Sequence, residues 1–211
     1  MKTGNSSTKP RVIGLLGGVA SGKSLVAECL EKLGAGRLDA DRAGHEVLKL
    51  PEVEAALRAR WGDAVFDAEG RVVRSEVAKI VFAQTDKGRR ELAFLESITH
   101  PLIGRKLEAE AQRLAENGYQ VIVLDAPVML KAGWDALCDA IVFVDAPENV
   151  RRDRALRRGW TADHFAAREQ AQESPGFKRK RANYVVDNGG TREATEVQVA
   201  ELWRKFQVCV E

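Results

Sequence analysis

The stretch from Gly17 to Ser24 reads Gly-Gly-Val-Ala-Ser-Gly-Lys-Ser and matches the pattern G-x-x-x-x-G-K-[ST] at each fixed position. Glycines let the backbone N–H groups of such a loop turn inward around phosphate oxygens, and a helix starting there adds its positive dipole end. The Lys23 ammonium can reach β- and γ-phosphates, and the Ser24 hydroxyl can bind Mg²⁺. The predicted nucleotide-binding residues are Gly17, Gly18, Val19, Ala20, Ser21, Gly22, Lys23 and Ser24.

The segments flanking this loop have the pattern of the strand and the helix that a P-loop requires. Residues 12–16 form an apolar run long enough for one buried strand. After the loop, apolar residues recur at the spacing of one helix face: Val26, Cys29, Leu30 and Leu33. Gly34 is placed to end that helix.

Further apolar runs predict the rest of a sheet. We expect strands at residues 37–39, 121–125, 140–145 and 184–187, each ending in aspartate. Nearly continuous β-branched runs separated by helical stretches indicate a parallel sheet covered on both faces. Between residues 51 and 118 no strong strand pattern occurs, so we expect a helical insertion, broken near Gly62, Gly70, Gly88 and Pro101.

Several strand-end carboxylates are candidates for chemistry. Asp125 is placed to hold Mg²⁺ from the strand beside the loop, although an aspartate there can also cap the strand exit. Asp39 and Asp41 close the second strand, where alternation turns their side chains in opposite directions. One of them can accept a proton from an attacking hydroxyl. A pair of capping aspartates explains the same two residues equally well.

A basic segment follows the fourth strand. Residues 151–181 carry ten basic and four acidic side chains, a local charge of +6 in a chain whose net charge is only +2. Arg151, Arg154 and Arg158 fall on one helix face. Arginine forks clamp phosphate oxygens, so the segment is interpreted as a lid over a bound nucleotide. The alternatives are a solvated basic helix and a nucleic-acid patch.

Composition restricts the class of protein. A length of 211 residues with 45% hydrophobic residues suits one ordinary globular domain, and a net charge of +2 argues against a dedicated nucleic-acid binder. Three distant cysteines suggest neither a zinc site nor a disulfide framework and favour reduced thiols in the cytosol. No apolar run is long enough to span a membrane. Residues 1–11 are expected to form a disordered tail.

Together these motifs resemble the dephospho-CoA kinase family, from about residue 12 to residue 190. The specific signals are Leu33-Gly34 before Asp39-Ala40-Asp41, Arg74 ahead of Val81-Phe82, the block Leu95-Glu96-Ser97-Ile98-Thr99-His100-Pro101-Leu102-Ile103, the lid arginines Arg154 and Arg158, Arg168 with Ala171-Gln172, and Asp187-Asn188. The loop itself identifies only the P-loop superfamily.

The resemblance implies ATP-dependent phosphorylation of the ribose 3′-hydroxyl of dephospho-CoA, the last step of coenzyme A synthesis, with Mg²⁺. It implies an α/β, three-layer P-loop kinase fold in a single domain, residues 12–211. That domain has a parallel five-stranded sheet, a helical acceptor-binding subdomain at about 50–118 and an arginine-rich lid at about 148–180. The implied roles are Asp41 as base, Lys23, Arg154 and Arg158 as catalytic cations, Asp39, Asp41, Arg74 and His100 on the acceptor side, and Asn188 at the nucleotide. A cytoplasmic enzyme without nucleic-acid or membrane partners is implied. A monomer is compatible with the sequence, which leaves the oligomeric state open.

The chain departs from the family pattern in places. His45 stands where the family often has arginine, and Lys131 where it has an acid, which puts roles for those positions in doubt. The alternatives are another P-loop kinase of small metabolites, a degenerate ATP-binding protein, and a nucleotide-dependent switch. A guanine-reading N-K-x-D is absent, and D-x-x-G occurs at residues 67–70 and 187–190, neither after the third strand.

Overall fold

The computed structural model describes residues 9–208, so most of the expected N-terminal tail, as well as Cys209, lies outside the described residues. The chain divides into two compact units. One consists of Met1–Leu38 together with Glu110–Glu211, and the other of Asp39–Ala109. Within residues 9–208, no helix combines the length and apolarity that a membrane span needs.

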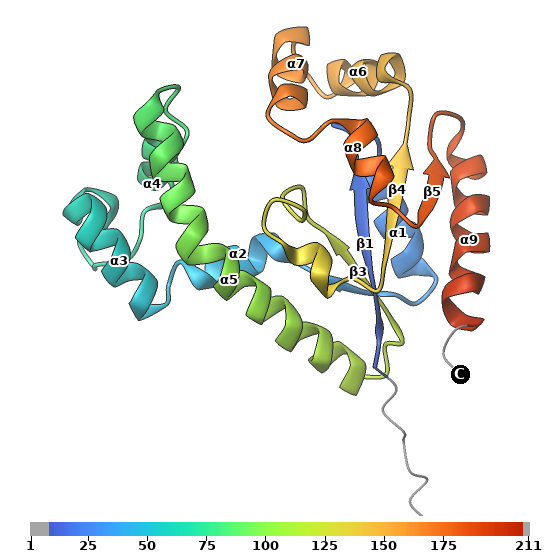
Figure 1. Cartoon of the computed structure of the whole chain (residues 1–211), viewed down its shortest axis with the longest axis horizontal. Helices are drawn as coiled ribbons and strands as arrows, with labels where there is room; N and C mark the ends of the chain where they lie inside the picture. The colour runs from blue at the N-terminus through green and yellow to red at the C-terminus, as the bar shows by residue number, and fades with distance from the viewer. Residues whose placement is uncertain (1–8, 209–211) are drawn as a thin grey trace, which may run out of the picture. The chain divides into compact units, whose positions relative to one another are not determined.

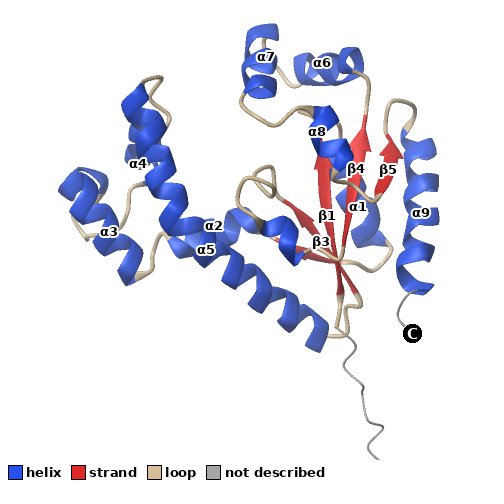
Figure 2. Ribbon diagram, in the orientation of Figure 1, coloured by secondary structure: helices blue, strands red, loops and turns tan. Residues whose placement is uncertain are grey.

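The first unit is built on a five-stranded sheet in the order β2-β3-β1-β4-β5, with all neighbouring strands parallel (Figures 1 and 2). Its strands are β1 (Arg11–Gly17), β2 (Gly36–Leu38), β3 (Val121–Asp125), β4 (Ala140–Asp145) and β5 (Tyr184–Asp187). The predicted third, fourth and fifth strands are confirmed residue for residue. The first is one residue longer at each end, and the second ends one residue earlier, at Leu38.

Two helices cover one side of this sheet. α1 (Lys23–Lys32) buries Val26, Cys29 and Leu30, as the spacing predicts, and packs with α9 (Arg192–Val208) in the same apolar cluster as Ile13 and Leu15. Gly34 follows α1 with a φ of +110°, a left-handed conformation that glycine adopts without strain. Leu33 is different from the expectation: it lies past the last helical turn and is exposed.

The remaining elements of the first unit connect the strands. The 3₁₀ helix η2 (Trp134–Leu137) precedes β4. Three short helices separate β4 from β5: α6 (Glu148–Arg157), α7 (Ala162–Gln170) and α8 (Pro175–Lys180). These helices make up the segment expected to be a lid.

The second unit is helical, as predicted. It contains α2 (Ala40–Val47), α3 (Pro51–Trp61), the 3₁₀ helix η1 (Gly62–Val65), α4 (Arg74–Val81) and most of α5 (Asp86–Glu116). The predicted breaks near Gly88 and Pro101 are wrong, because α5 runs through both. Gly88 lies in the first turn, and Pro101 removes only one N–H donor from a helix held by buried residues such as Ile103 and Leu107.

A buried carboxylate ties α3 to α5 within this unit. Glu91 is 6% exposed and accepts hydrogen bonds from both Nε and Nη2 of Arg60, at 2.9 and 3.0 Å. The indole N–H of Trp61 donates to the same carboxylate at 2.7 Å. The hydrogen bonds from Arg60 and Trp61 lower the pKa of Glu91 below its ordinary value of 4.5.

We expect Glu91→Gln to lower the melting temperature at pH 7 and to reduce its dependence on acid. Because the folded-state pKa of Glu91 is lowered, its carboxylate stabilises the fold above pH 4.5, and this contribution is lost as the pH falls below that value. Thermal melts at pH 7 and pH 3.5 check this, with Glu108→Gln on the exposed face of the same helix as the control. Parent and variant curves that stay parallel at both pH values would contradict the assignment.

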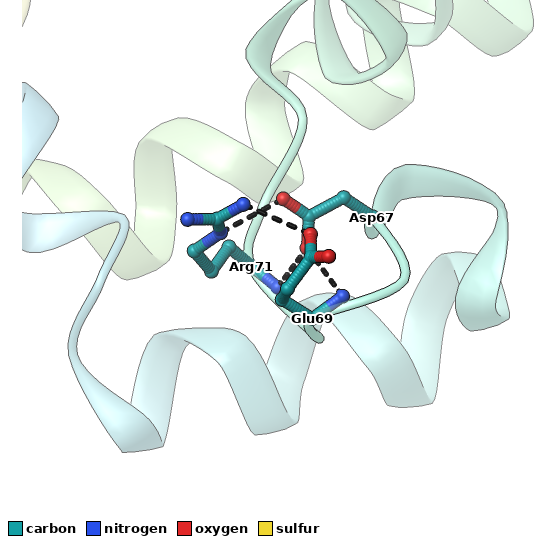
Figure 3. A network of polar contacts seen from close by, with 3 residues as sticks. All are labelled: Asp67, Glu69 and Arg71. Atoms are coloured by element: carbon teal, nitrogen blue, oxygen red, sulfur yellow. Dashed lines mark hydrogen bonds and ion pairs between the residues drawn. The ribbon is translucent and has the colours of Figure 1, made fainter.

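A tight turn before α4 accounts for one of the two D-x-x-G sequences. Figure 3 shows the Asp67 carboxylate accepting from the backbone N–H groups of Glu69 and Arg71, at 3.1 and 2.8 Å, and from the Arg71 guanidinium. These bonds lower the pKa of Asp67, and the bond from the Arg71 backbone N–H has the largest effect. Asp67 therefore builds a turn, and in the other D-x-x-G Asp187 accepts from the Gly189 N–H at 2.7 Å. Both aspartates serve local turns, so neither of these two sequences supports a nucleotide switch.

Candidate active site

The loop between β1 and α1 has an open, electropositive helix start. Gly22 is the N-cap of α1 with a φ of +95°, and no described side chain caps the helix or adds an acidic group to its first turn. The first N–H groups of α1 are thus left for a ligand, the arrangement that favours phosphate. Ala20 has a φ of +57°, the one left-handed residue other than glycine in the described chain.

The carbonyl groups of the loop are held from outside by residues far away in the sequence. The Gly17 carbonyl lies 3.5 Å from Nζ of Lys178, and the Val19 carbonyl accepts from Arg151 at 3.2 Å. The Ser21 carbonyl accepts from Asn188 at 2.7 Å and from Arg154 at 3.2 Å. With these carbonyls bound outside, the first N–H groups of α1 are left for an anion, while the Val19 N–H donates to Glu169 at 3.0 Å.

Lys23 occupies the first position of α1 beside two carboxylates. Burial lowers its pKa, while the charges of Asp125 and Glu169 act in the opposite direction. Asp125 ends β3 opposite Leu15 of β1, in the register that brings this strand end to the loop. Ser24 is the next residue of α1 and is exposed. The structure therefore brings Lys23 and Asp125 together, as the strand pattern predicts.

Asn188 follows β5 and is fully occupied by the loop and its support. Its side-chain N–H₂ binds the Ser21 carbonyl, and its side-chain oxygen accepts from the buried hydroxyl of Thr195 at 2.9 Å. A side chain on Gly22 would collide with the Asn188 amide. Asn188 therefore stabilises the shape of the phosphate loop by binding its backbone.

Arg154 lies under the loop, and two further arginines lie next to it. Its Nη1 and Nη2 donate to the carbonyls of Ser21 and Asn188, at 3.2 and 2.8 Å. Burial lowers the pKa of Arg154, and the positive charges of Arg158 and Arg157 lower it further. Arg157 and Arg158 are exposed. This concentration of positive charge at the loop favours an anionic ligand.

Sequence reasoning did not assign a site role to three residues that meet the loop: Arg151, Glu169 and Lys178. Lys178 is only 2% exposed, and its ammonium donates to Oε1 of Gln172 at 2.7 Å. Burial lowers the pKa of Lys178, and the nearby charge of Lys23 lowers it further. Two ammonium groups that repel each other at the loop are a second sign of an anion site. In the sequence, the count of basic residues in 151–181 and the common helix face of its arginines pointed to this segment, but not to these contacts.

The two aspartates after β2 lie in the helical unit, and their expected strand conformation is wrong. β2 ends at Leu38, Asp39 is the N-cap of α2, and Asp41 lies in the first helical turn. The Asp39 carboxylate accepts from the Arg42 N–H at 2.7 Å. A short acidic side chain that binds the N–H three residues later starts a helix, which is why the strand stops. Asp39 thus has the capping role that the sequence left open, while Asp41 is exposed.

The other predicted acceptor-side residues lie on different helices of the same unit. Arg74 is the first residue of α4 and is exposed, and His100 lies in the middle of α5, half-buried. His100 therefore lies inside α5 and not at the helix break that was expected near Pro101. His45 is exposed in the last turn of α2.

The oxygen donors of the site suit a hard cation. In the described part of the chain, no three His, Cys, Asp or Glu side chains gather into a metal-binding group, so a cation held by protein side chains alone does not fit. The Ser24 hydroxyl, next to Lys23 in the chain, and the Asp125 carboxylate, whose charge acts on Lys23, fit Mg²⁺, which is typically held by one or two protein oxygens, waters and substrate phosphates.

Comparisons with known proteins agree on one family. The family model described as dephospho-CoA kinase matches residues 11–193. The dephospho-CoA kinase of Corynebacterium diphtheriae is 37% identical over 207 residues, covering 95% of this chain and 100% of that protein. That of Novosphingobium aromaticivorans is 38% identical over 206 residues, covering 95% of this chain and 96% of that protein.

Solved structures show the same fold. A crystal structure from Thermus thermophilus has a TM-score of 0.75 and 31% identity, covering 93% of this chain and 97% of that one. A shikimate kinase from Acinetobacter baumannii, 14% identical with a TM-score of 0.52 over 95% of each chain, shares the fold alone.

Proposed function

This chain belongs to the dephospho-CoA kinase family, and we propose that it transfers the γ-phosphoryl group of ATP to the ribose 3′-hydroxyl of dephospho-CoA. The observation that carries this proposal is the phosphate loop of residues 17–24, with an open helix start and carbonyls bound from outside, in a chain related to these kinases along most of its length. The product is coenzyme A, and the reaction is its last synthetic step.

We propose that the chain's cations act on the phosphates. Lys23 binds β- and γ-oxygens, and Arg158 neutralises charge on the transferring group, since it is exposed and its charge acts on Arg154, which contacts the loop. Arg154 keeps the Ser21 carbonyl turned outward while adding its charge. Phosphoryl transfer depends mostly on such positioning and charge, because the transition state is loose.

We propose that the helical unit, residues 39–109, binds dephospho-CoA. Asp41 accepts the 3′-hydroxyl proton, Asp39 holds the first turn of α2 in place, and Arg74 and His100 contact the acceptor. The exposed carboxylate of Asp41 supports this role, because a base must be reachable by the hydroxyl.

We propose Mg²⁺ as the companion of ATP, held by Ser24 and, through water, by Asp125. When bound, it would supply positive charge that neutralises the phosphate oxygens. Lys23 and the N-terminus of α1 orient the same phosphates from the protein side.

We further propose that the enzyme works in the cytoplasm on small molecules, without a nucleic-acid or membrane partner. Reduced thiols support this location: Cys29 is buried and Cys138 half-buried, both free, and burial raises the pKa of Cys138 to about 12. The net charge of −4 outside residues 151–181, which is the difference between +2 for the chain and +6 for that segment, supports the absence of a nucleic-acid partner.

The deciding experiment is ATP consumption with and without dephospho-CoA. Turnover that requires dephospho-CoA, with product phosphorylated at the 3′-oxygen, is the expected result. An acceptor panel distinguishes the other candidates: preference for a different alcohol would indicate another P-loop kinase, and ATP binding without transfer to any acceptor a degenerate binding protein.

We expect Arg158→Ala and Arg154→Ala each to lower turnover by about 10²-fold. For Arg158→Ala we also expect little change in the melting temperature. Arg158 is exposed, so its loss removes charge from the reaction and little packing. Arg154→Ala should in addition raise the KM for ATP, because its guanidinium holds the Ser21 and Asn188 carbonyls.

Steady-state kinetics and thermal melts on both variants check this prediction. Arg152→Ala is the matched control, since Arg152 is an exposed arginine on the same helix α6. Turnover within twofold of the parent for both variants would show that neither arginine acts on the transferring phosphate.

A further inference from the structure

Val19, in the phosphate loop, is bound through both of its backbone groups by one ion pair. Its N–H donates to Oε1 of Glu169 at 3.0 Å, and its carbonyl accepts from Nη1 of Arg151 at 3.2 Å. Arg151 and Glu169 in turn form an ion pair at 2.6 Å, with side chains 6% and 21% exposed. The three residues close a ring of charge-assisted hydrogen bonds.

The surroundings of Arg151 leave its guanidinium little freedom. Its Nε also donates to the Ala146 carbonyl at the end of β4, at 3.1 Å. It lies across Gly18, where an added Cβ would come within 2.7 Å of Nη1. A planar fork with several donors can reach these acceptors together, which a lysine ammonium cannot do at the same positions.

An apolar contact reinforces this ring. The Val19 side chain packs in a buried cluster with Ala155 of α6 and Phe165 of α7, and Ala20 and Trp160 pack against it. Helices α6 and α7 therefore hold the loop at Val19 through an ion pair and through apolar packing.

The backbone conformation of the residue after Val19 indicates what these contacts stabilise. Ala20 has a φ of +57°, a region that L-residues with a Cβ seldom adopt because it costs energy. Such a conformation persists only where the surroundings determine it. The bound peptide groups of Val19 are the immediate support on one side, and the Ser21 carbonyl, held by Asn188 and Arg154, is the support on the other.

We propose that Arg151 and Glu169 are positioning residues for nucleotide binding: together they hold Val19 so that the phosphate loop, with Ala20 left-handed, is already shaped for phosphates before ATP arrives. This inference rests on the proposed role of residues 17–24 as the nucleotide site. Neither residue has to touch ATP for it to hold.

The expected signature is a loss of affinity with little loss of rate. Without the pair, the loop spends part of its time in other shapes, and the apparent dissociation constant rises in inverse proportion to the competent fraction. Once nucleotide has bound, the loop is formed again, so kcat changes little while the KM for ATP rises.

The test is calorimetric titration with ADP, which needs no acceptor, together with steady-state kinetics. We expect Arg151→Met to raise the Kd of ADP at least about tenfold, the equivalent of one lost charge-assisted hydrogen bond, and to keep kcat within about threefold. Glu169→Gln, whose amide oxygen still accepts from Val19, should have a smaller effect in the same direction. Arg151→Lys should recover part of the loss.

Two combinations make the test specific. The double variant Arg151→Met with Glu169→Gln should bind ADP no worse than Arg151→Met alone, because the pair acts as one unit. Adding Ala20→Gly to Arg151→Met should recover about fivefold in affinity, since glycine adopts the left-handed conformation without a penalty. If Arg151 only stabilised the fold, its substitution would lower the melting temperature, and Ala20→Gly would not recover the ADP affinity.

The control is Arg152→Met, an exposed arginine on α6 next to Arg151, which should leave Kd and KM unchanged. Unchanged ADP affinity in Arg151→Met and Glu169→Gln, with binding by the parent intact, overturns the inference and leaves the proposed function standing. Failure of Ala20→Gly to recover affinity overturns the claim about loop shape. A parent protein that does not bind ADP overturns the proposed function itself.

Discussion

Replacement of Lys23 by alanine is expected to lower phosphoryl transfer by at least about 10³-fold and to weaken ATP binding, because it removes the loop's own cation from the β- and γ-phosphates. The ammonium stands at the first position of α1, where burial lowers its pKa while Asp125 and Glu169 act to keep it charged. A bound triphosphate would add negative charge at the same place. The substitution thus removes a charge at the point where the reaction needs it.

The fold should survive this change. Lys23 is at the start of α1, outside the cluster of buried apolar residues that joins α1 to the sheet and α9. Lys32→Ala, at the exposed last turn of the same helix, is the matched control and should behave as the parent. Rates from a coupled assay and ATP affinities from calorimetry decide the matter. Near-normal turnover in Lys23→Ala would mean that residues 17–24 are not the site of phosphoryl transfer.

Replacement of Asp41 by asparagine is expected to lower kcat at least about 10²-fold, with ATP affinity nearly unchanged. Asparagine keeps the shape of the side chain and removes the anion that would accept the 3′-hydroxyl proton. General-base removal costs about 10²–10⁴-fold, and a loose transition state, in which the proton leaves late, places the expected loss at the low end. Because Asp41 is exposed, its substitution should leave the melting temperature close to that of the parent.

Asp39→Asn is a matched control for this experiment. Asp39 caps α2 through its bond to the Arg42 N–H, and asparagine caps a helix about as well as aspartate does. The start of α2 should thus remain intact, and the loss of turnover should be smaller than for Asp41→Asn. Measurement of kcat and ATP affinity for both variants tests the assignment. An inactive Asp39→Asn beside an active Asp41→Asn would show that the base was assigned to the wrong carboxylate.

Much of the first unit could be predicted because its signals are local. β3 and β4 are short runs of apolar, mostly β-branched residues, which is the pattern of a strand buried on both faces. β5 has a similar run but lies at the edge of the sheet, where Val185 is exposed. The bounds of all three agree with the structure. β2 is only three residues long and pairs with β3 along its whole length, but β3 continues one residue further and so does not set the end of β2. The capping bond of Asp39 then starts a helix at the point where the sequence suggested one more strand residue.

Long helices of the second unit were less predictable. Gly88 and Pro101 weaken a helix locally, so a reading of residues one after another breaks α5 at both. The structure keeps α5 continuous, because buried side chains along it, and the bonds of Glu91 to Arg60 and Trp61, stabilise more than one missing backbone hydrogen bond costs.

By itself, the sequence determined the phosphate loop, the strand before it, the helix after it and the family, since these depend on neighbouring residues whose types and spacing can be read directly. Only the tertiary structure decided what holds that loop in shape. Arg151, Lys178 and Asn188 meet its carbonyls across 132, 161 and 167 positions of the chain, and Glu169 meets the Val19 N–H across 150. In the sequence, Arg151 and Lys178 belong to a basic segment, Glu169 is one of its few acids, and Asn188 follows a strand. Their role arises from the parallel sheet, which brings the ends of β1, β4 and β5 together and so turns separate charges into one support for the phosphate site.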